Sequence, residues 1–204
     1  MTHELATAIT GGLSHPSKMP GPGWSIPAKR CLTGSKLRKI PGSICEKCYA
    51  LKGRYAFPTV QDALERRLKG FKNPRWEEAM VFLIGDTEWF RWFDSGDLQS
   101  KEMLQRIMSV CRATPRTRHW LPTREYGIVG QVAESEPIPP NLTIRLSAHM
   151  REGQTPRSLL RPGVTASNVS KSFYTCPAPK QDNFCGKCRK CWDRRVKDVT
   201  YKLH

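Results

Sequence analysis

The sequence predicts a mixed α/β domain with a small, partial-barrel-like parallel sheet, an irregular N-terminal lead-in and a cysteine-rich C-terminal segment. Short apolar or aromatic runs alternate with stretches of helical periodicity through the middle of the chain, a pattern typical of βαβ units. The length of 204 residues suits one domain with a small appendage. We therefore expect residues 1–175 to form the α/β domain and residues 176–204 to pack on it.

The lead-in, residues 1–44, is rich in Gly, Pro, Ser and Lys. We expect it to be irregular and extended, with Trp24 and Ile26 available for burial. Helical spacing begins at Val60 in VQDALERRLKGF, and Pro74 is well placed near the start of a second helix in PRWEEAMVFLIG.

The middle of the chain alternates strands and helices. Strands are expected at residues 88–93, 119–121, 142–147 and, as a fourth, near 164–167. Between them, SKEMLQRIMSVCRA predicts a helix with Ser100 as its cap and one apolar stripe, and a further helix is expected near 126–133. The stretch GKCRKCWDRRVKDVTYKL predicts a basic helix that begins inside the last cysteine motif.

Binding sites of parallel sheets gather at the carboxyl ends of the strands. By that rule, one shared rim carries Asp94, Asp97, Thr123, Glu125 and His149. An alternative interpretation of residues 94–97 is an ordinary turn, in which Asp caps the next helix and Gly96 supplies the bend.

Positive charge concentrates at the two ends of the chain. The 34 Lys and Arg residues exceed the 18 Asp and Glu residues, so the net charge is +16. Residues 1–73 carry 13 basic and 4 acidic side chains, residues 74–175 carry 13 and 11, and residues 176–204 carry 8 and 3. This clustering favours a nucleic-acid or nucleotide partner. A solvated basic surface, or compensation of an anionic metal cluster, explains the same charge.

No apolar run approaches the ~20 residues of a membrane-spanning helix, and the first residues lack the features of a secretory signal. We therefore expect no membrane association and a cytoplasmic protein. In a reducing cytosol, the eight cysteines favour metal ligation or redox chemistry over disulfides.

Four cysteines close to the C-terminus form the stronger motif. Two consecutive C-x-x-C steps let one loop wrap three thiolates around one centre, and a fourth cysteine precedes them. This spacing is typical of four-iron, four-sulfur ferredoxin loops, whereas zinc sites usually pair two separated C-x-x-C knuckles. The predicted ligands are Cys176, Cys185, Cys188 and Cys191, with zinc as the alternative metal.

A second predicted set consists of Cys31, Cys45 and Cys48. Three thiolates leave either a metal centre with one open position, where a substrate or cofactor can bind, or a site that is short of one ligand. An alternative pairing joins Cys45 and Cys48 to Cys188 and Cys191 in one zinc-ribbon-like site. The eighth cysteine, Cys111, lies on an apolar helical stripe and is predicted to be a core residue.

The runs ICEKCYALKGRYAFPTV, WFRWFDSGDL and HWLPTRE resemble the phage gene-88 protein family. The resemblance covers roughly residues 15–150, and it would place the protein in the cytoplasm of a host cell. The family has Lys where this chain has Arg124. The matching positions are Cys45, Cys48, Tyr49, Ala50, Gly53, Tyr55, Phe57, Arg91, Asp94, Ser95, Gly96, Asp97, Thr123 and Glu125.

That family in turn resembles the radical S-adenosylmethionine superfamily, in which three cysteines hold a cluster whose open iron binds S-adenosylmethionine. The resemblance implies this role for the N-terminal cysteines, although their first gap of thirteen residues departs from the usual C-x3-C-x2-C spacing. It also implies that the acidic turn contacts the cofactor. The predicted cofactor-binding residues are Asp94, Ser95, Gly96, Asp97, Thr123 and Glu125, of which Asp94 and Asp97 are the predicted catalytic pair.

Two functions follow from these observations. The first is an iron-sulfur protein with one or two four-iron clusters that resembles a radical S-adenosylmethionine enzyme, acts on an anionic substrate and needs an electron donor. The alternative is a non-catalytic basic protein, stapled by iron-sulfur or zinc, that binds nucleic acid without chemistry.

Overall fold

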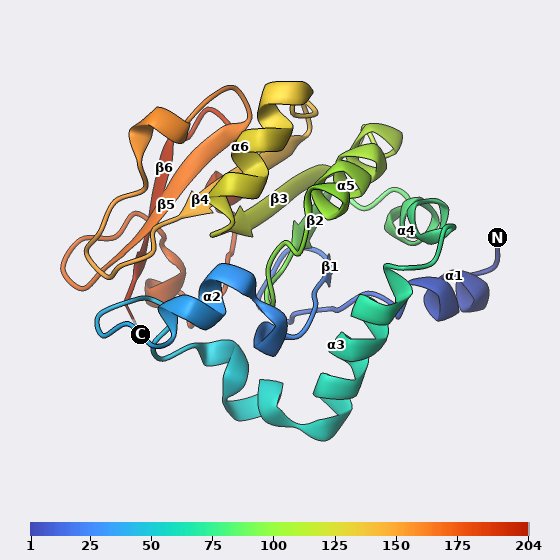
Figure 1. The fold of residues 1–204 in the computed structure, drawn as a ribbon, viewed down its shortest axis with the longest axis horizontal. Coiled ribbons are helices and arrows are strands. Elements are labelled where there is room, and N and C mark those ends of the chain that lie inside the picture. Colours follow the sequence, from blue (N-terminus) through green and yellow to red (C-terminus); the bar gives the residue numbers. More distant parts are fainter. Residues whose placement is uncertain (204) are drawn as a thin grey trace.

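The computed structural model describes residues 1–203 and contains one six-stranded sheet. All neighbouring strands are parallel and lie in the order in which they occur in the chain. The first and last strands are not paired with each other, so the sheet is not closed into a barrel (Figure 1). The strands are β1 Gly23–Trp24, β2 Trp89–Trp92, β3 Arg118–Thr123, β4 Leu142–Ser147, β5 Val164–Ser170 and β6 Asp198–Lys202. The α/β prediction is therefore confirmed.

Helices form much of the crossover connections between the first four strands, as parallel pairing requires. The helices are α1 His3–Thr10, which precedes β1, and then α2 Leu32–Leu37, α3 Pro58–Gly70, α4 Trp76–Ile84, α5 Lys101–Ala113 and α6 Tyr126–Ser135. Helices α5 and α6 lie along one face of the sheet, and α4 packs beside α5 (Figure 1). Within residues 1–203, no helix is both long and apolar enough to cross a membrane.

The elements predicted for the middle of the chain are present. The Ser100 hydroxyl accepts a hydrogen bond from the Met103 amide at 3.1 Å and caps α5. Cys111 is fully buried on the apolar stripe of this helix, as predicted. The strand prediction for residues 142–147 matches β4 in full.

The lead-in is more ordered than predicted. Residues 1–44 contain α1, β1 and α2 rather than an irregular, extended segment. Thr2 caps α1 by accepting a hydrogen bond from the Leu5 amide, and Gly11 ends the helix in the left-handed conformation. Trp24 is fully buried and packs against other aromatic rings of the core, so the expected burial is confirmed.

The prediction of a C-terminal basic helix is wrong. The segment contains a single 3-10 turn at Lys190–Trp192, and β6 follows it. Val199, Thr200 and Tyr201 favour extended backbone because their side chains are β-branched or aromatic. They pair with β5, and Val199 is buried. Pairing with a neighbouring strand outweighs the helical propensity of the Lys and Arg residues before it.

The two faces of the sheet differ in chemistry because side chains alternate along each strand. The face under the helices is apolar, with Phe90, Trp92 and Leu121 in the main core. The opposite face carries Arg91, Trp120 and Arg145 and is covered by the segment that contains the C-terminal cysteines. There, the Trp192 ring packs edge-on against Trp120 at 5.1 Å between centroids.

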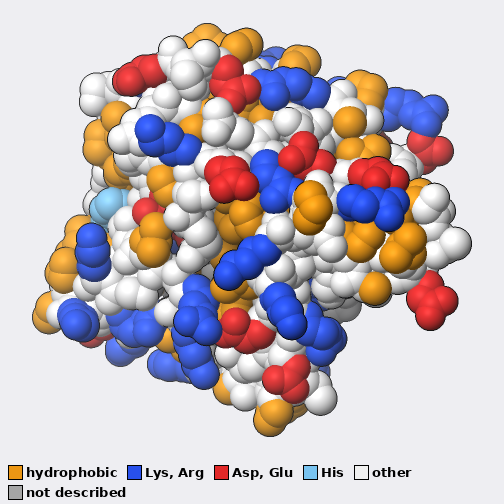
Figure 2. All heavy atoms as spheres, turned by 45° about the vertical axis from the view of Figure 1, so that its right-hand side comes forward, with side chains coloured by type: hydrophobic (Ala, Val, Ile, Leu, Met, Phe, Trp, Pro, Cys, Tyr) orange, Lys and Arg blue, Asp and Glu red, His pale blue; other side chains and the backbone are white. Residues whose placement is uncertain are grey.

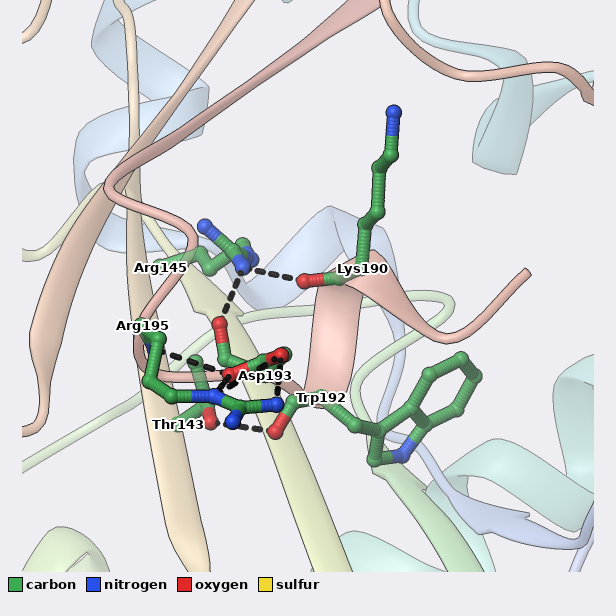
Figure 3. A network of polar contacts seen from close by, with 6 residues as sticks. All are labelled: Thr143, Arg145, Lys190, Trp192, Asp193 and Arg195. Carbon is green, nitrogen blue, oxygen red and sulfur yellow. Dashed lines mark hydrogen bonds and ion pairs between the residues drawn. The ribbon is translucent and has the colours of Figure 1, made fainter.

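One buried side chain fastens this segment to the sheet. Arg145 of β4 has no exposed surface and donates hydrogen bonds to main-chain carbonyls of the C-terminal segment (Figure 3). Its guanidinium bonds the carbonyls of Cys191 at 3.0 Å, Asp193 at 3.1 Å and Val196 at 3.1 Å, and also that of Lys190. Further bonds reach Thr165 and Ala166 of β5.

We predict that Arg145→Met destabilises the protein by at least about 3 kcal/mol, because it leaves several buried carbonyls without a donor. The free energy of unfolding in urea measures the loss. Hydrogen exchange should also rise first in residues 188–203. The control is Arg116→Gln, which breaks only an exposed ion pair with Asp86 and should change stability by less than about 0.5 kcal/mol. Equal effects of the two variants would contradict the fastening role.

A second prediction concerns pH. Burial lowers the pKa of His119 to about 3, so the folded protein keeps this ring neutral while the unfolded chain protonates it near pH 6.5. Protonation of the unfolded-state His119 therefore removes about 2 kcal/mol of stability between pH 6.5 and 5. Urea unfolding at both pH values, compared with a variant that lacks this imidazole, measures the contribution.

The matched variant for the pH prediction is His119→Gln, which should lose less stability over the same interval. Burial raises the pKa of Asp97 to about 6, which acts in the opposite direction below pH 6. Because Asp97 is present in both proteins, the difference between them isolates His119. An identical pH dependence for the two proteins would contradict the assignment.

Candidate functional site

A cavity of about 670 Å³ opens at the carboxyl ends of β2 and β3. The N-terminal cysteine loop, the turn after β2 and the last residues of β6 all contribute to its lining. The two terminal parts of the chain meet beside it, because the Lys18 ammonium donates to the Asp182 carbonyl at 2.9 Å and the Cys185 amide donates to the Lys18 carbonyl at 3.0 Å. The location agrees with the general position of sites in parallel sheets.

The cavity contains part of the predicted site. All three N-terminal cysteines and the four residues of the acidic turn line it. Thr123, Glu125 and His149 lie on the same rim but do not line it, and neither do the four C-terminal cysteines. Arg124 does line it, while its backbone amide bonds Asp97 and its carbonyl is hydrogen-bonded to the His149 ring.

Two of the N-terminal cysteines, Cys31 and Cys45, approach Gly34 of α2. A Cβ on Gly34 would lie 3.6 Å from both the Cys31 and the Cys45 sulfur, so these sulfurs are no more than twice that distance apart. Burial raises the pKa of Cys31 to about 12, and the charges of Asp97, Cys48 and Cys45 add to the effect. Near neutral pH, the free thiol is therefore protonated.

The C-terminal cysteines form a separate group, in the segment that covers the face of the sheet opposite the helices. Burial raises the pKa of Cys191 to about 11, and its sulfur lies 3.1 Å from the Tyr201 hydroxyl. The cysteines that raise the pKa values of Cys176, Cys185 and Cys191 all belong to this group. The structure therefore favours two groups over a mixed site of Cys45, Cys48, Cys188 and Cys191.

As the side chains stand, no three His, Cys, Asp or Glu residues within residues 1–203 lie close enough together to hold a metal ion. The cysteines are free thiols. Metal ligation by either group remains a prediction.

Asp94 lies in the turn after β2 and accepts hydrogen bonds that hold the cysteine loop beside this strand. Its carboxylate accepts a hydrogen bond from the Tyr55 hydroxyl at 2.9 Å and another from the Ser25 hydroxyl, and its carbonyl accepts one from the Tyr49 hydroxyl at 2.5 Å. Tyr49 directly follows Cys48. These bonds hold the chain that leaves the last cysteine of the loop.

Asp97 joins the ends of two neighbouring strands. Its carboxylate accepts hydrogen bonds from the Thr123 hydroxyl at 2.5 Å and from the Arg124 amide at 2.9 Å, both at the end of β3. A third bond comes from the Leu98 amide at 2.8 Å. Burial raises the pKa of Asp97 to about 6, and the hydrogen bonds partly offset this rise.

Glu125 holds the helix that follows Cys31. Its two carboxylate oxygens accept hydrogen bonds from the Thr33 amide and hydroxyl, both at 2.8 Å. Because Thr33 lies in the first turn of α2, these bonds also satisfy a free amide at the helix start. Glu125 therefore positions the loop instead of facing the cavity.

The small residues of the acidic turn have a packing role. Gly96 has φ of +78°, and a Cβ there would lie 2.4 Å from the Ile26 side chain, so only glycine fits. The Ser95 carbonyl accepts a hydrogen bond from the Ile26 amide at 3.2 Å, whereas its buried hydroxyl has no partner within residues 1–203.

Several contributors were not assigned a role from the sequence. Tyr49, Tyr55 and Arg91 occur in the motifs that resemble the gene-88 family, but their contacts depend on how the loop folds back over the sheet. Ser25 and Thr33 do not belong to any of these motifs. Their roles follow only from the loop geometry.

Positive charge surrounds this region. Lys and Arg side chains gather over the lower part of the molecule, where α2 and α3 lie, whereas both signs mix above (Figure 2). The basic residues that line the cavity are Lys18, Arg38, Lys47, Arg91, Arg124 and Lys202.

Comparison with known proteins adds one match. A family model described as Gene product 88 matches residues 6–194. No curated protein matches the chain, and no solved structure does. The family match spans both cysteine groups, the acidic turn and all the strands except β6. This chain belongs to the Gene product 88 family.

Proposed function

We propose that the protein is an iron-sulfur enzyme of the radical S-adenosylmethionine type. The observation that carries this proposal is the placement of Cys31, Cys45 and Cys48. They lie together in a loop after β1, beside the turn that follows β2 and at the mouth of a cavity large enough for a cofactor and a small substrate.

The residues present fit an open four-iron cluster. The donor set consists of three thiols, and each thiolate of such a cluster binds its own iron, so the sulfurs spread wider than around a single ion. Gly34 leaves the space between Cys31 and Cys45 free of side chain. Binding would release the protons of thiols whose pKa values burial raises.

The loaded cluster would supply one electron for reductive cleavage of S-adenosylmethionine, and an external donor would reduce it again. The chain's own contribution is to hold the loop that binds it. Asp94 and Glu125 fix the loop to the rim, and Asp97 holds together the strand ends that form this rim. Phe93 and Ala148 give the cavity apolar walls that limit access of water.

We further propose that Cys176, Cys185, Cys188 and Cys191 bind a second four-iron cluster, with zinc as the alternative. All four thiols are partly buried. Arg145 fixes the carbonyls of Lys190 and Cys191, which holds the last C-x-x-C step against the sheet.

The second candidate function is nucleic-acid binding without catalysis. It is favoured by the net charge of +16 and by the Lys and Arg side chains that gather on one part of the surface (Figure 2). This function predicts binding that weakens steeply with salt and no consumption of S-adenosylmethionine.

Metal analysis tests the proposed function. We predict that anaerobically purified protein contains iron and acid-labile sulfide, and that Cys45→Ser loses the portion bound by the N-terminal group. The control is Cys111→Ala, which removes a core cysteine and should keep the full iron content. S-adenosylmethionine should change the electron paramagnetic resonance spectrum of the reduced wild type and not that of Cys45→Ser.

Zinc in place of iron, or a spectrum indifferent to S-adenosylmethionine, would contradict the proposed enzyme. Salt-sensitive binding of nucleic acid with no consumption of S-adenosylmethionine would favour the second candidate.

A substitution at Gly34 tests the position of the N-terminal cluster. We predict that Gly34→Ala lowers the iron content, because its methyl group would lie 3.0 Å from the Cys31 Cβ and 3.6 Å from two sulfurs. Stability should fall little, because alanine favours a helix by about 1 kcal/mol over glycine. Iron analysis and thermal unfolding measure the two effects. The control is Gly127→Ala in α6, where the new Cβ meets open space. Full iron retention by Gly34→Ala would contradict the placement.

A further inference from the structure

Three arginines that line the cavity lack acidic partners. Arg38, Arg91 and Arg124 form no ion pair within residues 1–203. The Nε atom of each is buried and has no hydrogen-bond partner among the described residues. A partly buried guanidinium without a partner is costly, so three around one cavity require an explanation.

Arg91 lies between the two cysteine groups. Arg91 lines the cavity together with the N-terminal cysteines, and its charge partly offsets the burial that raises the pKa of Cys185 in the C-terminal group. Its guanidinium stacks on the Trp120 ring at 4.4 Å from the centroid. One hydrogen bond goes to the Met19 sulfur, a weak acceptor, and the other, to the Phe93 carbonyl, is long at 3.4 Å. Stacking fixes the plane of the guanidinium and leaves its donors weakly used.

Arg124 and Arg38 approach the same space from the rim and from the end of α2. The charges of both partly offset the burial that raises the pKa of Cys45, which places them on the N-terminal side of the cavity. The Arg38 side chain donates one long bond, at 3.3 Å, to the Ala28 carbonyl. The Arg124 side chain has no hydrogen bond among residues 1–203.

The cavity contains too little negative charge to balance these groups. Its two carboxylates are Asp94 and Asp97, and both are engaged by neighbouring hydroxyl and amide donors. Lys18, Lys47 and Lys202 add further positive charge to the lining. A cluster on the three N-terminal thiolates would offset part of this positive charge, and a ligand with several negative charges would offset the rest. A phosphate group supplies more negative charge than a single carboxylate.

We propose that this cavity binds a small phosphorylated substrate, with its phosphate group held by Arg91 and Arg124. Guanidinium groups bind phosphate through paired, charge-assisted hydrogen bonds. The volume of about 670 Å³ suits a small molecule, and a polynucleotide would have to lie along the outer surface. Trp120, which already stacks on Arg91, orients the guanidinium that receives the phosphate.

This inference deepens the proposed function, because it names the class of substrate for the same cavity. Its test does not need a bound cluster. Absence of iron from the wild type would defeat the enzyme proposal and leave phosphate binding measurable.

The test is calorimetric titration of the anaerobically purified full chain with pyrophosphate. We expect saturable binding, weakened at least about tenfold in Arg91→Gln and in Arg124→Gln. Arg91→Lys should retain part of the affinity because it keeps the charge without the fork of donors. The control is Arg116→Gln, which changes an exposed arginine and should bind as the wild type does. Thermal unfolding of each variant identifies any that fails to fold. If Arg91→Gln does not fold, Arg124→Gln alone tests the proposal.

Parallel titrations separate the possible ligands. Succinate should bind at least about tenfold more weakly than pyrophosphate, and a single-stranded oligonucleotide should bind equally well to the wild type and to Arg91→Gln. Preference for succinate, or loss of oligonucleotide binding alone, would overturn the proposal. So would an Arg91→Gln variant that loses iron but binds pyrophosphate with unchanged affinity, because Arg91 would then balance cluster charge.

Discussion

The architecture depends on one buried guanidinium. Arg145 lies in the middle of the sheet, and its donors are taken up mainly by main-chain carbonyls, one from β5 and the others from the C-terminal segment before β6. Because these acceptors are neutral, the charge is stabilised only while the surrounding backbone keeps its shape. The C-terminal cysteines, the Trp192 ring and β6 therefore depend on this group for their position. The same hydrogen bonds hold the C-terminal segment over the polar face of the sheet.

The acidic residues of the rim serve the cysteine loop in a way that the motifs alone did not indicate. Asp94 holds the chain after Cys48, Glu125 holds the helix after Cys31, and Asp97 joins the ends of β2 and β3. A loop with a gap of thirteen residues between its first two cysteines has high conformational entropy. The two carboxylates that fix it on the rim, Asp94 and Glu125, reduce the cost of gathering its thiols.

The elements in the middle of the chain could be predicted from the sequence because their periodicity and caps are local. β6 could not, since its pairing partner lies about thirty residues earlier and its flanks are rich in Lys and Arg. The three N-terminal cysteines line one cavity, the four C-terminal ones do not, and Cys111 lies in the core. Metal binding by either group is still a prediction from their spacing. The sequence did not indicate a role for Arg91. This residue alternates with aromatic residues in β2, and only the packed sheet shows which face it occupies.

The contact between Lys18 and the segment around Asp182 and Cys185 has a consequence for how the site is made in the cell. The cysteine loop and the acidic turn leave the ribosome early, whereas the segment that closes the opposite side of the cavity emerges after every other strand except β6. Until then, the N-terminal thiols lie in an unfinished pocket. A ligand that needs the finished cavity can therefore bind only after this segment has been synthesised.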